Sequence, residues 1–262
     1  MKRYLDLVPI SAKIHRKQSR MSIFCIVLAV FLVTTIFGMA DMFVRSQIVQ
    51  ARLDGGNFHA ALRYITDEEA FLIAQRPEIK AAARYGVLNY RGEDGYTLSG
   101  KTAVIMGCDE PFVTDMMVDG IVEGNFPQTE SEIMLTQSAK ARLGFQVGDT
   151  IVMDGPDDKK LSYMISGFCK DTIKTTSEDS LGAAITTEAF RTIYPAVKNE
   201  TLEDYDSVFY IQFENPWKAR QEISDLKADC GLSDDQIYEN VKLLGMYGQS
   251  DSSQMMQIYA VA

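Results

Sequence analysis

An uncharged stretch of twenty residues, Met21–Ala40, constrains this chain more than any other feature. Its sequence, MSIFCIVLAVFLVTTIFGMA, is interrupted only by Ser, Thr and Gly. A helix of this length rises about 30 Å, which is the thickness of the hydrocarbon core of a bilayer. A buried helix of a soluble domain is usually shorter and carries a polar face. The stretch therefore predicts a transmembrane helix, which we place at residues 21–44.

The charges around this helix predict its orientation. Six basic residues and one acidic residue precede it in the basic segment 1–20, and Asp41 follows it. The positive-inside rule then places the N-terminus in the cytoplasm and the residues from about 45 onward outside. A cleaved signal peptide is the alternative, because Gly38-Met39-Ala40 resembles a small-x-small cleavage site. The apolar run is, however, longer than the usual apolar region of a signal peptide.

The rest of the chain is acidic. Residues 41–262 hold 20 basic and 35 acidic residues, a net charge of −15. Nucleic-acid binding requires an excess of Lys and Arg on one face, so we expect no nucleic-acid partner. The content of Gly, Pro and aromatic residues argues against a disordered or fibrous chain. About 200 residues beyond the apolar stretch suffice for one core or for two small lobes.

The first part of this acidic region predicts a β-α-β unit. Residues 58–65 have the composition of a strand. Thr66 and Glu69 form a capping box that starts a helix, and Pro77 ends that helix. Residues 79–91 are again typical of a strand.

The same order of elements returns near the end of the chain. Residues 207–213 alternate as a strand does, and Pro216 begins a helix that stops at Gly231. We expect residues 237–244 to form the closing strand. The two β-α-β units therefore flank a turn-rich middle section, residues 120–172, which we expect to be mostly β.

The last residues of the sequence are also apolar. Residues 255–262 read MMQIYAVA, which is too short to cross a bilayer. They fit either a final element tucked into the core or, as we expect, the start of a second transmembrane helix at 254–262 that the sequence truncates.

No catalytic motif in the sequence has the structural context that it requires. Gly95–Thr102 fits the P-loop pattern, but a P-loop needs a helix after it, and Ala103–Gly107 is strand-like. We therefore expect a hairpin there. The two histidines, His15 and His59, accompany neither a nucleophile elbow nor a zinc spacing. We expect no catalytic residue, no cofactor-binding residue and no metal ligand.

The remaining candidate groups have ordinary explanations. Cys108, Cys169 and Cys230 are either buried thiols or one disulfide with an unpaired thiol. The acidic clusters are mostly explained as helix starts and turns, with weak cation binding as the alternative. Asn199-Glu200-Thr201 is a glycosylation sequon, which matters only in a eukaryotic secretory pathway.

A family likeness covers nearly the whole chain. A basic lead-in, Ser11–Arg20, runs directly into the apolar helix, and the most specific run of matching residues lies between 120 and 170. Together these segments resemble the FtsX/MacB-type permease subunits of ABC transporters. The further matching segments are Phe71–Lys80, Val104–Asp109, Ile121–Pro127, Glu132–Leu135, Ala139–Gly144, Val147–Ile151 and Ile165–Phe168.

The resemblance implies an α+β fold on an N-terminal transmembrane helix. In that family an extracytoplasmic domain, here residues 45–253, has a β-α-β porter-like lobe with an inserted small, mostly β lobe. The positions that correspond are 57–119 and 173–247 for the porter-like lobe and 120–172 for the inserted lobe. The family continues into further membrane helices, so this chain resembles only the first helix and the first outer domain.

The resemblance also implies a function and partners. Such a permease couples ATP hydrolysis by a separate cytoplasmic ABC ATPase to movement of the extracytoplasmic domain. The movement serves export, antimicrobial-peptide resistance or the release of lipoproteins or other substrates. The expected location is the cell (plasma or inner) membrane. The expected partners are the ATPase subunit, the lipid bilayer, a second permease domain or protomer, and an exported substrate that the sequence does not identify.

Two other interpretations remain open. The chain fits a complete single-pass protein whose extracytoplasmic domain binds a ligand or acts as a sensor. It also fits, less well, an extracytoplasmic enzyme or a P-loop NTPase with Lys101 in its loop.

Overall fold

The structure, a computed structural model, describes residues 16–90, 92–117, 120–156, 159–171, 180–198 and 207–248. Its contacts divide the chain into two compact units that meet between Val49 and Gln50. We refer to the second unit as the body. The predicted start of a second membrane helix at 254–262, the sequon at 199–201 and His15 lie outside the described residues.

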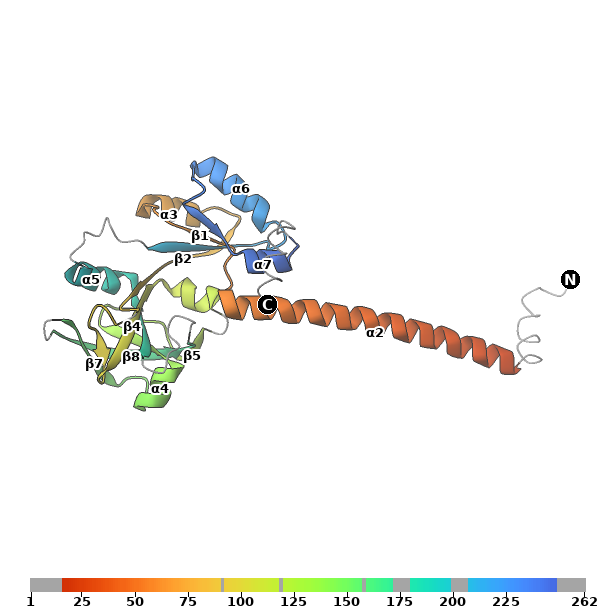
Figure 1. The fold of residues 1–262 in the computed structure, drawn as a ribbon, viewed down its shortest axis with the longest axis horizontal. Helices are drawn as coiled ribbons and strands as arrows, with labels where there is room; N and C mark the ends of the chain where they lie inside the picture. Colours follow the sequence, from red (N-terminus) through yellow and green to blue (C-terminus); the bar gives the residue numbers. More distant parts are fainter. Residues whose placement is uncertain are drawn as a thin grey trace. The chain divides into compact units, whose positions relative to one another are not determined.

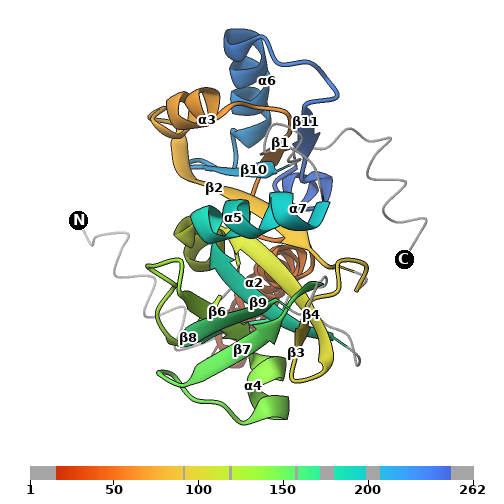
Figure 2. The ribbon, with the colours of Figure 1, turned by 90° about the vertical axis from the view of Figure 1, so that its left-hand side faces the viewer.

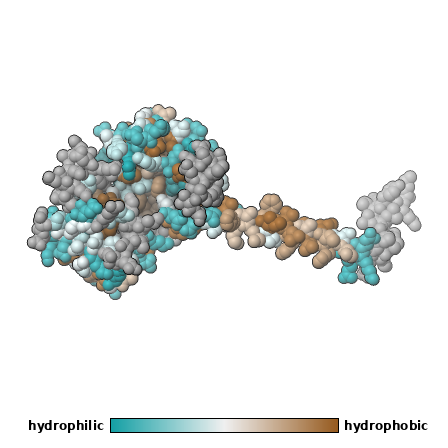
Figure 3. All heavy atoms as spheres, in the orientation of Figure 1, coloured by the Kyte–Doolittle hydropathy of each residue, from teal (hydrophilic) through white to brown (hydrophobic). Residues whose placement is uncertain are grey.

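Helix α2 (Arg16–Gly55) contains the whole predicted span and continues beyond it. Figure 3 shows its apolar side chains as a continuous run, and the large ones between Met21 and Val44 are exposed. The hydroxyl of Thr35 donates to the Phe31 carbonyl at 2.7 Å, so this polar group is satisfied within the helix. Within the described part of the chain, α2 alone is long and apolar enough to cross a membrane, a test that a signal sequence also meets.

Four strands of the body form an open antiparallel sheet in the order β11-β1-β10-β2 (Figures 1 and 2). Along the chain they belong to two β-α-β units. This order and connectivity are those of a split β-α-β, or ferredoxin-like, arrangement. The elements are β1 (Ala60–Leu62), α3 (Asp67–Ala74), β2 (Ile79–Leu88), β10 (Val208–Phe213), α6 (Ala219–Cys230) and β11 (Ile237–Glu239).

Both helices of this sheet cover the same face. Their apolar side chains pack on alternate residues of the strands, which is why the strands show a period of two. One buried cluster contains Leu62, Ile211 and Phe213 from the strands and Ile73 and Leu226 from the helices. We call residues 57–88 and 207–248 the open-sheet lobe.

Six further strands close into a ring. Each pairs with the next in the order β4-β3-β7-β8-β6-β9, and β9 pairs in parallel with β4 to complete the circle. The ring surrounds its own buried cluster, which includes Ile105, Ile133 and Phe168. Because the ring is closed, none of these six strands forms a free edge of it. They are β3 (Thr97–Leu98), β4 (Lys101–Cys108), β6 (Glu132–Thr136), β7 (Thr150–Asp154), β8 (Lys160–Cys169) and β9 (Ser180–Thr186).

Four shorter elements accompany the ring and the open sheet. Strand β5 (Ile121–Gly124) pairs with β8, and α4 (Gln137–Leu143) follows β6. A π-helix, η2 (Phe112–Met116), follows β4, and α5 (Thr187–Lys198) follows β9. We call the described residues between 89 and 198 the ring lobe. Helix α7 (Val241–Met246) belongs to the open-sheet lobe.

Strand β4 joins the two lobes. Its first residues pair with β3, its last residues pair with β2 on the same edge, and its other edge pairs with β9. The ring therefore uses strands from both sides of the 120–172 segment. The division into a porter-like lobe (57–119 and 173–247) and an inserted lobe (120–172) stays a prediction.

Most predicted elements are present. The capping box of Thr66 and Glu69 starts α3 as predicted. The hairpin predicted at 95–102 is also confirmed: Ser99 and Gly100 have φ of 51° and 77°, the turn that matches the twist of paired strands. A strand follows this turn, so the helix that a P-loop requires is not there.

Three predicted strands are shorter than expected. The strand predicted at 79–91 ends at Leu88, and Asn89 after it has a φ of 59°. Only Ala60–Leu62 of the segment 58–65 forms a strand, and Tyr64 has a φ of 55°, which takes the chain out of the sheet. The closing strand predicted at 237–244 is wrong beyond Glu239. There the Asn240 side chain accepts the Leu243 amide and starts α7.

Candidate functional site

The groups that could carry chemistry lie in structural roles. Among the described residues no group of three or more His, Cys, Asp or Glu side chains could hold a metal ion. Lys101 starts strand β4 in the hairpin. His59 is 3% exposed, and its Nδ1 accepts the Phe213 amide at 2.9 Å. Burial lowers the pKa of His59 to about 4, with smaller contributions from Arg52 and Lys80, so the imidazole is neutral near pH 7.

The cysteines of the body are thiols. Cys108 and Cys169 are buried in one apolar cluster, while Cys230 is exposed on α6. Burial raises the pKa of Cys169 to about 12 and that of Cys108 well above its usual value. The expectation of buried free thiols therefore holds for two of the three, and Cys230 departs from it.

One hydrogen-bonded polar group in the body surrounds the end of α2. We call residues 50–58, Asn240, α7 and Tyr247 the stalk junction. The Asn240 side chain donates to the carbonyls of Gly56 (3.2 Å) and Phe58 (3.0 Å), and its own amide donates to the His59 carbonyl (2.9 Å). Because the same side chain also starts α7, one residue ties the chain leaving α2 to α7.

Two further contacts fix the last turn of α2 within the body. Asp54 forms an ion pair with Lys242, and this hydrogen bond is the main reason that the pKa of Asp54 is lowered. Arg52 Nη2 donates to the Tyr247 hydroxyl at 2.7 Å. The Tyr247 ring in turn meets Trp217 edge-on, with centroids 5.0 Å apart. Residues 50–55 and α7 are thus joined by charge, by hydrogen bonds and by a neighbouring aromatic pair.

Asn57 connects the stalk junction to the ring lobe. Its amide donates to the Met116 carbonyl at 2.7 Å, and its side chain donates to the Asp115 carbonyl at 3.2 Å. The last carbonyls of a helix have no partner within the helix, and here Asn57 supplies one for each of these two in η2. Gln212 donates to the Asn57 carbonyl at 2.8 Å, which holds Asn57 against the open sheet.

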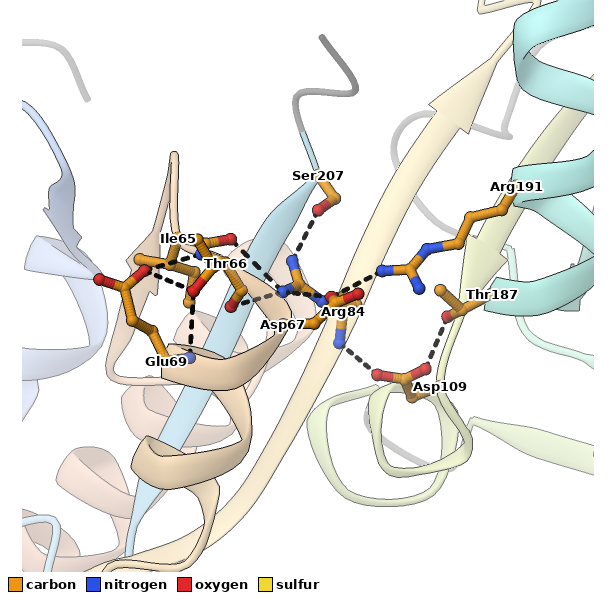
Figure 4. Close-up of polar contacts among 9 residues, drawn as sticks. All are labelled: Ile65, Thr66, Asp67, Glu69, Arg84, Asp109, Thr187, Arg191 and Ser207. Carbon is orange, nitrogen blue, oxygen red and sulfur yellow. Dashed lines mark hydrogen bonds and ion pairs between the residues drawn. The ribbon is translucent and has the colours of Figure 1, made fainter. Parts of the chain in front are cut away.

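A second polar group lies where α3, β2 and α5 meet (Figure 4). Arg84, on β2, is only 7% exposed. Its guanidinium donates to the Ser207 hydroxyl (2.8 Å) and the Thr66 carbonyl (3.0 Å) and forms an ion pair with Asp67 (2.8 Å). A buried charge is tolerated only when its donors are satisfied, and these partners satisfy it.

Two carboxylates extend this group to the ring lobe. Asp67, at the start of α3, also pairs with Arg191 of α5 at 2.7 Å, and the hydrogen bond from Arg191 is the main reason that the pKa of Asp67 is lowered. We call this ion pair the lobe latch. Asp109, after β4, accepts the Arg84 amide (2.7 Å) and the Thr187 hydroxyl (2.6 Å).

Neither polar group was predicted from the sequence to be functional. A basic residue within the apolar run around β2 was the available signal for Arg84, because an arginine there must find buried partners. Asn240 stands before a short apolar turn, where asparagine is a frequent helix N-cap. Their partners lie far away in the chain, up to 184 residues for Asn240.

The comparison with protein-family models identifies the kind of domain. The family model of the MacB-like periplasmic core domain matches residues 19–226. No curated protein matches the chain. Several solved structures also resemble it, and three of them are described next.

A domain of a putative permease from Porphyromonas gingivalis has 12% identity, a TM-score of 0.43, and coverage of 68% of this chain and 82% of that one. The periplasmic region of MacB from Actinobacillus actinomycetemcomitans has 12% identity, a TM-score of 0.46, and coverage of 77% and 97%. The extracellular domain of the noncanonic ABC-type transporter YknZ from Gram-positive bacteria has 9% identity, a TM-score of 0.47, and coverage of 70% and 99%. Because the family model matches most of its residues, this chain belongs to the MacB-like periplasmic core domain family of ABC transporter permeases.

Proposed function

We propose that this chain is part of a permease subunit that passes movement between its membrane helix and an extracytoplasmic domain. ATP hydrolysis takes place on a separate cytoplasmic ATPase, in keeping with the family. The movement serves export, peptide-antibiotic resistance or substrate release. In this proposal the basic segment before α2 is cytoplasmic and the body lies outside the membrane, with a second permease domain or protomer completing the transporter.

One observation supports this proposal: residues 50–58, at the end of α2, are bonded to Asn240, Lys242 and Tyr247. A flexible linker between helix and body would absorb any displacement of the helix. Here α2 continues without a break to Gly55, and Asn240 holds the next residues through the carbonyls of Gly56 and Phe58. A displacement of α2 along or about its axis is therefore passed to α7 and to the open sheet.

The test is a flexible insertion at the stalk junction. Four glycines inserted between Gly55 and Gly56 separate α2 from the body, and we expect transport to fall at least tenfold in the full-length permease with its ATPase. The matched control places the same four glycines between Ser99 and Gly100, at a hairpin tip where the space around Gly100 is open. Transport that survives the insertion after Gly55 would contradict the proposal.

The proposed orientation has a separate test in whole cells. Cys230 is exposed, whereas Cys108 and Cys169 are buried. A membrane-impermeant maleimide is therefore expected to label Cys230 in intact cells, and Cys230→Ser should remove that labelling. Labelling of Cys230 only after the cells are permeabilised would place the body on the cytoplasmic side and refute the orientation.

A further inference from the structure

The ring lobe contacts the open sheet on both of its faces. Along β2 the side chains alternate: Ala82 packs with the α3/α6 face, while Ala81 and Ala83 face η2. The ring lobe supplies η2 on the latter face. On the former face it supplies Arg191 of α5, which reaches Asp67 (Figure 4).

The contact through η2 is extensive and mostly apolar. Phe112 stacks on Tyr85 with ring centroids 4.4 Å apart and lies 5.6 Å from Tyr210. Met116 is buried with Ala81 and Ala83. The two hydrogen bonds from Asn57 fix the orientation of η2 in this apolar contact. Separating this face would expose aromatic surface and leave carbonyls of η2 without their partners.

The contact through the lobe latch is of a different kind. Its polar part is an ion pair between Asp67, with its side chain 64% exposed, and Arg191, with its side chain 33% exposed, and α5 also lies against β2 beside it. Water replaces such a bond readily, and exposed ion pairs contribute little net stability. Arg84 keeps its bonds to Thr66, Asp67 and Ser207 when the latch opens, because all three belong to the open-sheet side.

Between the two contacts lies a short run of paired strands. Only four residue pairs, Tyr85–Leu88 with Ile105–Cys108, join β2 to β4, and Gly86 stands opposite Gly107 in this run. Asp109 continues the pairing by accepting the Arg84 amide, and its own amide donates to the Arg84 carbonyl. We call these residues the hinge.

We propose that the ring lobe rocks about the hinge during the transport cycle, opening at the lobe latch while the η2 face stays closed. This rests on the proposed function, because the displacement comes from α2. It reaches the ring lobe through Asn57, which binds both the end of the stalk and the end of η2. The weaker contact releases first, so the direction of rocking follows from the chemistry of the two faces.

The test compares cross-linking at three cysteine pairs in the full-length permease with its ATPase in proteoliposomes. The background carries Cys25→Ser and Cys230→Ser, which removes the exposed thiols of this chain. Asp67→Cys with Arg191→Cys spans the lobe latch. Phe112→Cys with Tyr210→Cys spans the η2 face and leaves Asn57 in place. Arg76→Cys with Asp229→Cys is the matched control, since it replaces an Arg–Asp pair of the same 2.7 Å separation within one lobe.

We expect a bis-methanethiosulfonate reagent to cross-link the latch pair several-fold more slowly in the ATP-bound, hydrolysis-trapped state than without nucleotide. The other two pairs should react at the same rate in both states. Cross-linking of the latch pair should also reduce transport at least tenfold. A reductant should then restore the transport activity that this variant had before the reagent was added.

Each other outcome overturns the proposal. Equal rates for the latch pair in both states, or full transport by the cross-linked variant, would mean that the lobes do not rock. Slowing of the η2 pair together with the latch pair would mean that the ring lobe detaches instead of rocking. Failure of the proposed function shows separately, as transport that survives the four-glycine insertion after Gly55.

Discussion

The stalk junction and the lobe latch both join separate parts of the body, but they use different chemistry. Asn240, a neutral and mostly buried side chain, makes directed hydrogen bonds to two carbonyls and an amide. The latch is an exposed ion pair between Asp67 and Arg191. Directed bonds that exclude water hold one geometry, whereas an exposed ion pair exchanges with water and salt. We therefore expect the stalk junction to stay closed and the lobe latch to open.

The largest expected effect is that of Asn240→Ala. It removes the N-cap of α7 and leaves the carbonyls of Gly56 and Phe58 without this donor, so we expect a loss of about 2–3 kcal/mol in the free energy of unfolding. The single tryptophan of this chain, Trp217, lies against Tyr247 beside α7. Its fluorescence during urea unfolding therefore reports the change.

A matched control for this variant exists in the ring lobe. Asn89 is 1% exposed, and its side chain donates to the carbonyls of Tyr96 and Ala103. Asn89→Ala should destabilise the protein by a similar or larger amount, because Asn89 also has a φ of 59°. Only Asn240→Ala should reduce transport by more than its loss of folded protein explains. An equal loss of transport per folded molecule in both variants would remove the special role of the stalk junction.

The dependence of stability on pH is a smaller effect, and it differs between the region of the stalk junction and the lobe latch. The folded pKa of His59, which directly follows residues 50–58 of the stalk junction, is about 4, below its unfolded value of 6.5, so the unfolded chain binds the extra proton between these values. Stability is therefore full above the unfolded pKa and falls as the pH drops, by about 2 kcal/mol between pH 7 and pH 5. The pKa of Asp67 is lowered instead, so the latch keeps its contribution until the pH falls below the unfolded value of 3.8.

The measurement is the urea midpoint at the two pH values. His59→Gln keeps an acceptor for the Phe213 amide but does not titrate, so its midpoint should change much less between pH 7 and pH 5. A wild-type midpoint that is the same at both values would show that His59 is not buried as a neutral group.

The features that could be predicted from the sequence depend on neighbouring residues. The capping box of Thr66 and Glu69 needs only residues three apart, and the turn at Ser99 and Gly100 needs only its two residues. The capping box and a hairpin within residues 95–102 were predicted correctly, and the structure adds the position of the turn. The apolar stretch of α2 is equally local.

The features that were missed depend on distant partners. Residues 241–244 were predicted as strand, because a short apolar run fits a buried helix as well as a strand. Asn240 and its partners around Gly56 decide this, and they lie 184 residues apart. The parallel pairing of β4 with β9, which closes the ring, and the ion pair of Asp67 with Arg191 likewise join distant segments. No local pattern contains such pairings.

The smallest expected effect is that of Arg191→Gln at the lobe latch. An exposed ion pair contributes little, so the free energy of unfolding should change by less than about 1 kcal/mol. The change should shrink further at about 1 M salt, where the screening length is only about 3 Å. The latch-opened state, in contrast, should become more populated, because the variant keeps the hinge and the η2 contact and loses the bond that opposes rocking.

A control variant separates the effect of opening the lobe latch from the effect of losing any ion pair. Arg76→Gln, which breaks ion pairs to Glu78 and Asp229 within the open-sheet lobe, is the control and should leave the equilibrium between the lobes unchanged. Spin labels on exposed positions of the two lobes, Tyr64 and Val152, would measure that equilibrium by their separation. A broader or longer separation in Arg191→Gln alone fits a latch, whereas identical distributions in all three proteins would make the ion pair an incidental surface contact. Since both variants lose an arginine of similar exposure, a difference between them must come from the lobes that each arginine joins.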